Sequence, residues 1–328
     1  MTLPYDLVES LQNAPPEEAW RAVFREAWET CSLPIELAKA ESEISNRDQA
    51  IAKLDLYLAT AAWDLWRDYE RSVTLTSDAL SSWWSDQDGG HAVLILDGLS
   101  LREVPWLLTG AAEHGLDIQN VHVTGAELPA DTTPFAKSLG FAQRSALAND
   151  GAGASHKLTG ARTESTEIAW EDCATLVGSE PAWVFWHHWP DCKLHEHDEP
   201  GKGLSSLTAE VIEHLTGDAF WKLVSRLAEG RRLVITSDHG YAASGLFTDS
   251  DKDQSEYLKA AFKSGRWQKG TQQSGPWTPP LDLLLSTRQG TNLFVNGRRK
   301  WKSHGGYPTL THGGLTVLEV AVPFIEIG

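Results

Sequence analysis

The sequence predicts an α/β fold, a doubly wound and mostly parallel sheet with a helical N-terminal segment. Three short apolar runs carry this prediction, at residues 91–96, 182–186 and 233–236. None of them alternates between apolar and polar residues, which is typical of strands that are covered by helices on both faces. A helical pattern follows the first run at 101–114 and another precedes the last run at 208–229. This alternation of strands and helices favours a parallel sheet.

Residues 1–85 are predicted to form a helical N-terminal segment, and residues 86–328 the main domain. Two prolines and two glutamates at 15–18 are typical of a helix start, and Trp20, Val23 and Trp28 follow at helical spacing. A second amphipathic stretch runs from 34 to 72. We expect this segment to pack against the main domain. A partner-docking module is the alternative, because the sequence does not separate buried from exposed tryptophans.

The other elements of the main domain are predicted from local patterns. We expect a strand at 118–124, a polar turn that opens a helix at 135–139, and a loop or flexible insertion at 145–165, where the residues are small and polar. Residues 257–291 look like an excursion from the sheet, followed by a strand at 292–295. The chain closes with a short helix and a last strand near 320–327.

Composition limits the classes of function. The 328 residues are 41% hydrophobic and 22% charged, as in soluble globular proteins, and the formal net charge is −17. Such a surface repels nucleic acid and anionic lipid at long range, so metals or a local basic patch would have to attract an anionic substrate.

Cysteine usage and the chain start predict a cytoplasmic protein with no membrane partner. Cys31, Cys173 and Cys192 are odd in number and show no CxxC spacing, which fits a reducing compartment. The first residues lack the basic and apolar regions of a signal peptide, and no apolar run is long enough to span a membrane.

Acidic and imidazole side chains follow three of the predicted strands. Asp97 follows the first strand, Asp238 and His239 follow another, and Asp191 and His195 lie four residues apart in a loop after the third. His312 adds an imidazole near the C-terminus. Taken singly, each of these residues is as typical of a polar turn as of a metal site. Together, carboxylates and neutral imidazoles suit zinc, manganese or a similar divalent ion, and six ligands divide naturally into two sites. Two close metals can clamp the attacking and leaving oxygens of a phosphoryl transfer.

The order of these motifs resembles the PglZ domain of the alkaline phosphatase superfamily. The matching features, over about residues 93–327, are Asp97-Gly98, a Thr after Leu-Pro, Asp-xxx-His, Ser-Asp-His-Gly, and Thr-His-Gly-Gly-Leu followed by Glu319 and Val322-Pro323. The resemblance implies an alkaline phosphatase-like fold. It also implies that Asp97, Asp238 and His239 hold one metal, and that Asp191, His195 and His312 hold the other.

The resemblance further implies a nucleophile and substrate contacts. Thr132 matches the nucleophile, near a helix start where backbone N–H groups favour a phosphate. The adjacent Thr133 stays an alternative. Lys137 falls where the family often has a basic residue and could contact phosphate. His304 begins a second His-Gly-Gly triplet and could contact substrate. The family often has an arginine where this chain has Ser100, and Arg102 is the nearest replacement.

The function that the resemblance implies is a two-metal phosphoesterase. We expect a phosphodiesterase or nuclease that acts on nucleotides, oligonucleotides or DNA through Thr132, in a BREX-type phage-defence or related signalling setting, with other defence proteins as partners. The alternatives are a phosphomonoesterase and a non-catalytic assembly component. Basic residues with interleaved Trp267, Trp277 and Trp301 between 252 and 302 could grip phosphates and stack bases. A solvated face with core tryptophans is the simpler interpretation of that stretch.

Overall fold

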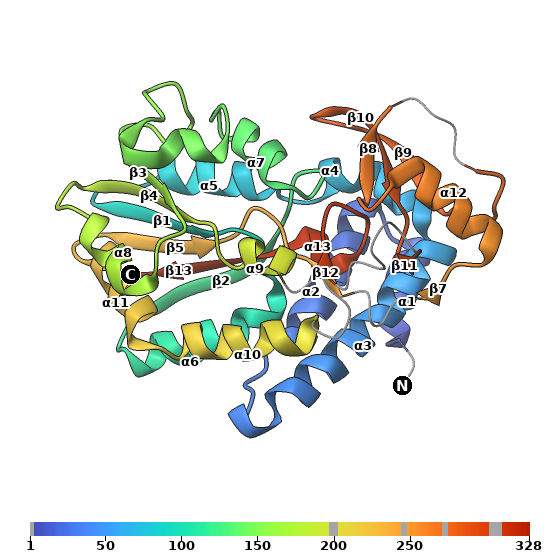
Figure 1. Ribbon diagram of the computed structural model, residues 1–328, viewed down its shortest axis with the longest axis horizontal. Coiled ribbons are helices and arrows are strands. Elements are labelled where there is room, and N and C mark those ends of the chain that lie inside the picture. The colour runs from blue at the N-terminus through green and yellow to red at the C-terminus, as the bar shows by residue number, and fades with distance from the viewer. Residues whose placement is uncertain (1–2, 197–202, 244–247, 271–274, 302–309) are drawn as a thin grey trace.

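The computed structural model describes residues 3–196, 203–243, 248–270, 275–301 and 310–328. A six-stranded sheet forms its centre, in the order β2-β13-β5-β1-β4-β3 (Figure 1). The strands are β1 (His91–Leu96), β2 (Ile118–Gly125), β3 (Arg162–Thr166), β4 (Ala182–His187), β5 (Arg232–Thr236) and β13 (Ala321–Ile327). β1 pairs in parallel with β4 and β5, and β3 pairs in parallel with β4. β13 runs in the direction opposite to the other five strands of this sheet, and it pairs antiparallel with β2 and β5. The predicted α/β fold with a mostly parallel sheet is therefore confirmed.

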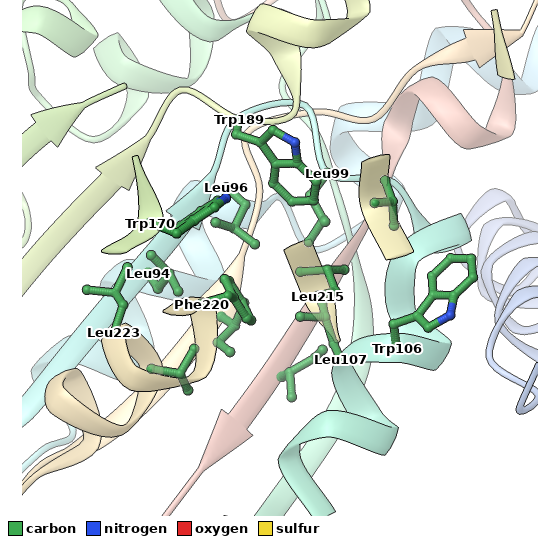
Figure 2. Packing of buried hydrophobic residues seen from close by; sticks show 14 of the residues in the cluster. Leu94, Leu96, Leu99, Trp106, Leu107, Trp170, Trp189, Leu215, Phe220 and Leu223 are labelled. Carbon is green, nitrogen blue, oxygen red and sulfur yellow. The ribbon is translucent and has the colours of Figure 1, made fainter. Parts of the chain in front are cut away.

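Alternate residues of the strands serve two different cores, one on each face of the sheet. Leu94 and Leu96 of β1 belong to the core beneath the helices α6 (Val104–Glu113), α8 (Trp170–Cys173), α10 (Leu204–Leu215) and α11 (Asp218–Ala228) (Figure 2). Val93 and Ile95 belong to the opposite core, beneath α5 (Thr76–Ser85), α7 (Thr132–Ser138) and the 3₁₀ helix η4 (Arg144–Asp150). Burial on both faces explains why the strands do not alternate in sequence.

The first 85 residues are mostly helical. The elements before α5 are α1 (Tyr5–Asn13), α2 (Pro16–Cys31), η1 (Leu37–Lys39), α3 (Ala40–Thr60), η2 (Trp63–Asp68) and α4 (Tyr69–Ser72). Trp20, Trp66 and Tyr69 pack edge to face or tilted in a third core, which also contains residues of α13 (Val317–Val320), β9 (Asp282–Thr287) and β10 (Gly290–Val295). The segment thus packs on the C-terminal part of the chain, while α5 covers the central sheet. The division into an N-terminal segment at 1–85 and a main domain at 86–328 stays a prediction.

The described residues between 248 and 301 form a peripheral layer on the right of Figure 1. It contains α12 (Lys252–Phe262) and a small sheet of β8 (Trp267–Lys269), β10 and β9. The short pair of β7 (Thr248–Asp249) with β11 (Arg299–Lys300) completes this layer. A second short pair, β6 (Ala242–Ala243) with β12 (Leu310–Thr311), lies nearer the central sheet. The β6–β12 pair positions the site, because it fixes the residue after β12, His312, beside the loop that follows β5.

Two predictions about single elements were wrong. The helix expected at 208–229 is two helices, because α10 ends at Leu215 and the extended Gly217 precedes α11. The loop expected at 145–165 contains most of η4 and the edge strand β3. The polar residues of β3 suit a strand with one neighbour, and Thr163 and Glu164 bond it to η4. Within the described ranges, no helix is long and apolar enough to cross a membrane.

Candidate metal centre

The candidate ligands converge because three adjacent strands end at the same edge of the sheet. β5, β1 and β4 lie side by side and run in parallel, so the segments after them meet. Asp97 follows β1, and Asp238 and His239 follow β5. After β4 the chain turns into the short helix α9 (Asp191–Glu196), whose Asp191 N–H donates to the Asp97 carbonyl at 2.8 Å. Ligand convergence at the carboxyl ends of parallel strands is the usual pattern in open α/β sheets.

The first candidate group consists of Asp97, Asp191 and His239, each of which offers one ligand atom within 4.8 Å of the others. His239 Nε2 lies 3.6 Å from Asp97 Oδ1 and 3.5 Å from Asp238 Oδ2. Asp238 therefore adjoins this group. Its other oxygen is occupied, since Oδ1 accepts from the Gly98 N–H at 3.0 Å and from the His239 N–H at 3.1 Å.

The second candidate group consists of Asp191, His195 and His312. Asp191 and His195 lie one turn apart on α9, as their spacing predicts, with His195 Nε2 3.7 Å from Asp191 Oδ2. His312 Nε2 lies 3.5 Å from Asp191 Oδ1, and the His312 ring stacks on His239 at 4.2 Å between centroids. Asp191 thus belongs to both groups, and the two groups form one continuous centre.

The residues present fit divalent cations. Among the described residues, three buried ligand atoms have no hydrogen-bond partner: Asp191 Oδ1, Asp238 Oδ2 and His239 Nε2. Burial, reinforced by the Asp238 and Asp191 charges, holds the pKa of Asp97 well above its usual range. Burial opposes the charging of His239, but the surrounding carboxylates outweigh it and raise the pKa of His239 to about 9. Bound cations would satisfy these atoms and offset the repulsion among the carboxylates.

Thr132 lies at this centre. It is the first residue of α7, and its hydroxyl donates to Asp97 Oδ1 at 3.2 Å. The neighbouring Thr133 is exposed. Of the two threonines that the sequence leaves open, Thr132 is the one that bonds a candidate ligand.

The two predicted substrate contacts have different outcomes. Lys137 is exposed in the last turn of α7, about 7 Å along the helix axis from Thr132. Its contact with phosphate stays a prediction. His304 lies outside the described residues, so its role also stays a prediction.

Arg144 is a residue of this centre that sequence reasoning missed. It opens η4 and forms an ion pair with Asp97 Oδ2, and 26% of its side chain is exposed. Burial disfavours its charge, but Asp97, Asp238 and Asp191 outweigh this effect and raise the pKa of Arg144. The residue stands at the edge of a segment whose composition is typical of a loop, so nothing in the local pattern points to it.

Arg102, the expected replacement for the family arginine, lies elsewhere. It is 2% exposed and its guanidinium pairs with Asp48 of α3. The nearby histidines have other partners: His187 stacks on Trp170 at 3.8 Å and bonds the Ile168 carbonyl, while His188 bonds the Ser165 hydroxyl. Burial lowers the pKa of His187 to about 4. These histidines are structural neighbours of the centre.

The basic and aromatic residues between 252 and 302 do not share one location. Some lie in the protein interior and one lies beside the metal centre. Arg266 and Arg298 are buried and pair with Glu319 and with Asp48 and Asp55. Trp301 belongs to the small core under α12. Trp267 of β8 lies beside the segment that leads into Thr132, where its Nε1 donates to Asp131 Oδ2 at 3.1 Å. The stretch is therefore not one continuous basic surface.

Comparisons with known proteins found similarity only to solved structures, since no family model and no curated protein matches the chain. Three of these structures are of ectonucleotide pyrophosphatase/phosphodiesterase 5. An inactive murine variant in complex with AMP is 13% identical, with a TM-score of 0.40, over 73% of this chain and 88% of that one. The murine protein is 14% identical, with a TM-score of 0.42, over 72% of this chain and 87% of that one. The human protein is also 14% identical, with a TM-score of 0.40, over 72% of this chain and 87% of that one. These values are too low to transfer an activity to this chain.

Proposed function

We propose that this protein is a phosphoesterase with two divalent metal ions, zinc or manganese, and that Thr132 is its nucleophile. One observation carries the proposal: the Thr132 hydroxyl contacts a ligand of a centre in which three buried ligand atoms lack partners among the described residues. The proposal agrees with the resemblance to PglZ domains of the alkaline phosphatase superfamily. Asp97, Asp238 and His239 would hold one ion. Asp191, His195 and His312 would hold the other.

The chain's own groups have distinct roles in this chemistry. Bound cations would make a hydroxyl or water more acidic and stabilise negative charge on phosphoryl oxygens. Asp97 Oδ1 accepts the Thr132 hydroxyl and so orients its oxygen toward the centre. Thr132 Oγ1 would give its proton to water and form a bond to phosphorus as the bond to the leaving alkoxide breaks. The alkoxide would take up a proton from water, and a second water would hydrolyse the phosphothreonine ester. Arg144 would donate to the phosphoryl oxygens and offset their charge.

A phosphodiester of a nucleotide or short oligonucleotide is the substrate that we favour. The support is Trp267, a half-buried indole held beside the nucleophile segment by its bond to Asp131. Indole faces stack nucleobases without sequence preference. Phosphomonoesters are the second candidate substrates. A role in phage defence, with other defence proteins as partners in the cytoplasm, is implied by the resemblance and by cysteine usage alone.

The test is hydrolysis of bis(p-nitrophenyl) phosphate and p-nitrophenyl phosphate, with Zn²⁺ or Mn²⁺ and with chelator. We expect chelator-sensitive diester cleavage that Thr132→Ala abolishes, while the matched variant Thr133→Ala retains it. Monoester cleavage alone would make the protein a phosphatase. Full metal occupancy without hydrolysis of either ester would contradict the proposal and favour a non-catalytic assembly component.

A further inference from the structure

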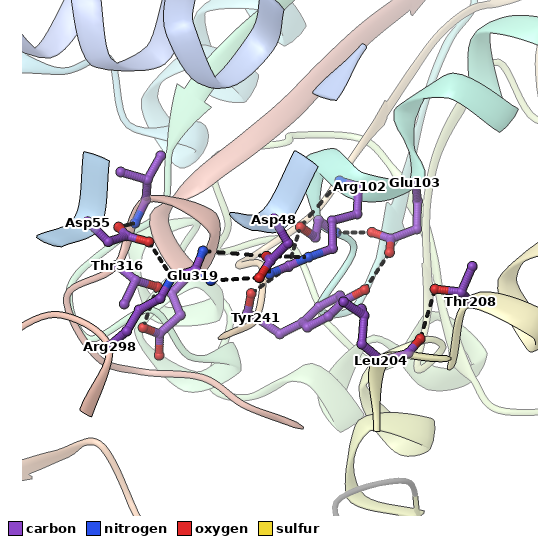
Figure 3. Close-up of polar contacts among 12 residues, drawn as sticks. Asp48, Asp55, Arg102, Glu103, Leu204, Thr208, Tyr241, Arg298, Thr316 and Glu319 are labelled. Carbon is purple, nitrogen blue, oxygen red and sulfur yellow. Dashed lines mark hydrogen bonds and ion pairs between the residues drawn. The ribbon is translucent and has the colours of Figure 1, made fainter. Parts of the chain in front are cut away.

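A buried charged network joins the N-terminal helix α3 to the loops that carry the metal ligands (Figure 3). Its members are Asp48 and Asp55 of α3, Arg102 and Glu103 of η3 (Leu101–Glu103), Tyr241, and Arg298. All six side chains are buried. Asp48 stands between the two arginines, because its Oδ1 pairs with Arg102 and its Oδ2 accepts from Arg298 Nη1 at 2.6 Å.

Arg102 bridges the two loops of the first ligand group. Its Nη1 donates to the Tyr241 carbonyl at 2.7 Å and to the Ser100 hydroxyl at 3.1 Å. Ser100 lies three residues after Asp97, and Tyr241 two residues after His239. The guanidinium also lies 4.5 Å over the Tyr241 ring. One side chain therefore holds the loop after β1 against the loop after β5.

Glu103 closes this bridge from the other side. Its Oε1 accepts from the Tyr241 hydroxyl at 2.6 Å, and its Oε2 accepts from the Ser100 N–H at 2.7 Å. Arg102 and Glu103 thus contact the same two loop residues. The position of Arg102 in turn depends on Asp48, whose carboxylate receives both its Nε, at 3.0 Å, and its Nη2.

The second half of the network extends toward His312. Arg298 Nε donates to Asp55 Oδ2 at 2.6 Å, and Asp55 Oδ1 accepts from the Val317 N–H at 2.7 Å. Val317 begins α13, five residues after His312. Burial raises the pKa of Asp48, but Arg102 and Arg298 outweigh it, so the pKa of this carboxyl is lowered and it stays charged at neutral pH.

We propose that Asp48 is a positioning residue of the metal centre, which acts through Arg102 to set the spacing between Asp97 and the Asp238–His239 pair. The inference rests on the proposed function for the identity of the ligands. It makes helix α3 part of the metal-binding machinery, although α3 lies outside the region that resembles a PglZ domain. Such outer partners of metal ligands affect metal affinity by about ten- to a hundredfold.

The experiment is titration of the metal-free full-length protein with Zn²⁺ by calorimetry, for the wild type and Asp48→Asn. Asp238→Asn identifies the binding step that belongs to the first group. We expect Asp48→Asn to weaken that step at least about tenfold and to leave the other step within about twofold. Equal affinity of the wild type and Asp48→Asn at the first step would overturn the proposal.

Two further variants separate positioning from general destabilisation. Leu54→Ala removes a fully buried side chain of the same helix that belongs to the apolar core, and we expect Zn²⁺ binding close to that of the wild type. An equal loss in Leu54→Ala and Asp48→Asn would contradict the proposal. If Asp48→Asn does not fold, Arg102→Lys keeps the charge but loses the fork that reaches Asp48 and the Tyr241 carbonyl together. We expect Arg102→Lys to lower the Zn²⁺ affinity of the binding step that belongs to the first group. Unchanged Zn²⁺ affinity at that step would contradict the proposal.

The two proposals fail in different ways. Zn²⁺ binding is measured without turnover, so a wild type that binds two ions but hydrolyses no ester would refute the proposed function and leave the role of Asp48 intact. Unchanged Zn²⁺ binding in Asp48→Asn, together with hydrolysis that depends on Thr132, would refute the role of Asp48 alone.

Discussion

Replacing Glu319 by glutamine should destabilise the protein strongly without creating a cavity. Glu319 is fully buried in α13, and its carboxylate accepts four hydrogen bonds. Arg266 donates two of them, at 2.8 and 3.1 Å, and the Gly314 N–H and Thr316 hydroxyl donate the others, at 2.8 and 2.7 Å. Glutamine has nearly the same shape, so the variant changes charge and donor pattern alone.

The magnitude follows from the partners. Glutamine removes the carboxylate that faces a guanidinium which is itself 2% exposed, and it turns an amide NH₂ toward one pair of donors. Removing one partner of a buried ion pair costs about 3 to 5 kcal/mol. We therefore expect Glu319→Gln to lower the free energy of unfolding by that amount. The Gly314 N–H belongs to the loop that follows His312, so Zn²⁺ affinity should fall as well.

The assay is urea unfolding of metal-free protein, with Glu326→Gln of β13 as the matched control. Glu326 also pairs with an arginine, Arg232, whose side chain is 49% exposed, while the Glu326 side chain is 12% exposed and also accepts hydrogen bonds from Trp83 and Asn120. Because solvent reaches the arginine, the ion pair itself should contribute about 0 to 1 kcal/mol, so we expect the control to lose clearly less than Glu319→Gln. A Glu319→Gln variant that is no less stable than the control would refute the electrostatic reasoning.

Four further predictions follow from single contacts. Burial raises the pKa of Glu127 to about 7, so the native protein binds the Glu127 proton more tightly than the unfolded chain does. The contribution of this proton to stability is lost as the pH rises from 4.5 through 7. We therefore expect urea unfolding at each pH to show that Glu127→Gln gains up to about 3 kcal/mol of stability relative to the wild type over that range. Arg144→Met should lower kcat/KM for the diester by about a hundredfold or more, since it removes a charged donor from the centre; a change below threefold would exclude Arg144 from phosphate binding. A Cβ at Gly240 would clash with the Leu318 carbonyl oxygen of α13, so Gly240→Ala should lower the free energy of unfolding by about 1 to 3 kcal/mol. Gly89→Ala, where the new Cβ would have nothing within 4 Å, should not. Removing metal with a chelator should lower Tm, and Zn²⁺ at a hundred times its Kd should restore about 2.7 kcal/mol of the free energy of unfolding per site. A Tm that changes with neither the chelator nor Zn²⁺ would count against a metal centre.

Elements with uniform burial were predictable from the sequence. β1, β4 and β5 are covered on both faces, so their apolar runs identify them, and the ligands that follow them in the chain meet because parallel strands end together. β3 could not be found in this way, because an edge strand with polar residues looks like a loop. The break between α10 and α11 was hidden because both helices bury their apolar faces in the same core.

Residues that act through long-range pairing could not be predicted. Arg144 reaches Asp97 across 47 positions, and Asp48 reaches Arg298 across 250. Neither pair has a local pattern, because a buried ion pair needs only opposite charges at one point in space. Arg102 shows the same limit: it lies two residues after Ser100, where the family often has an arginine, but its guanidinium turns to α3 instead.

The burial of arginines in the interior favours short substrates for the proposed phosphoesterase. Arg266 and Arg298 come from the most basic part of the chain, yet both are buried in ion pairs with carboxylates. They therefore contribute little to an attractive surface field, while the net charge of the chain is −17. A long polyanion would meet repulsion over its whole length, which bound cations and Arg144 would offset locally. A mononucleotide ester or short oligonucleotide avoids most of that repulsion. We therefore expect the rate of cleavage of such substrates to exceed that of long DNA. Added salt screens the repulsion, so it should narrow the difference between the two rates.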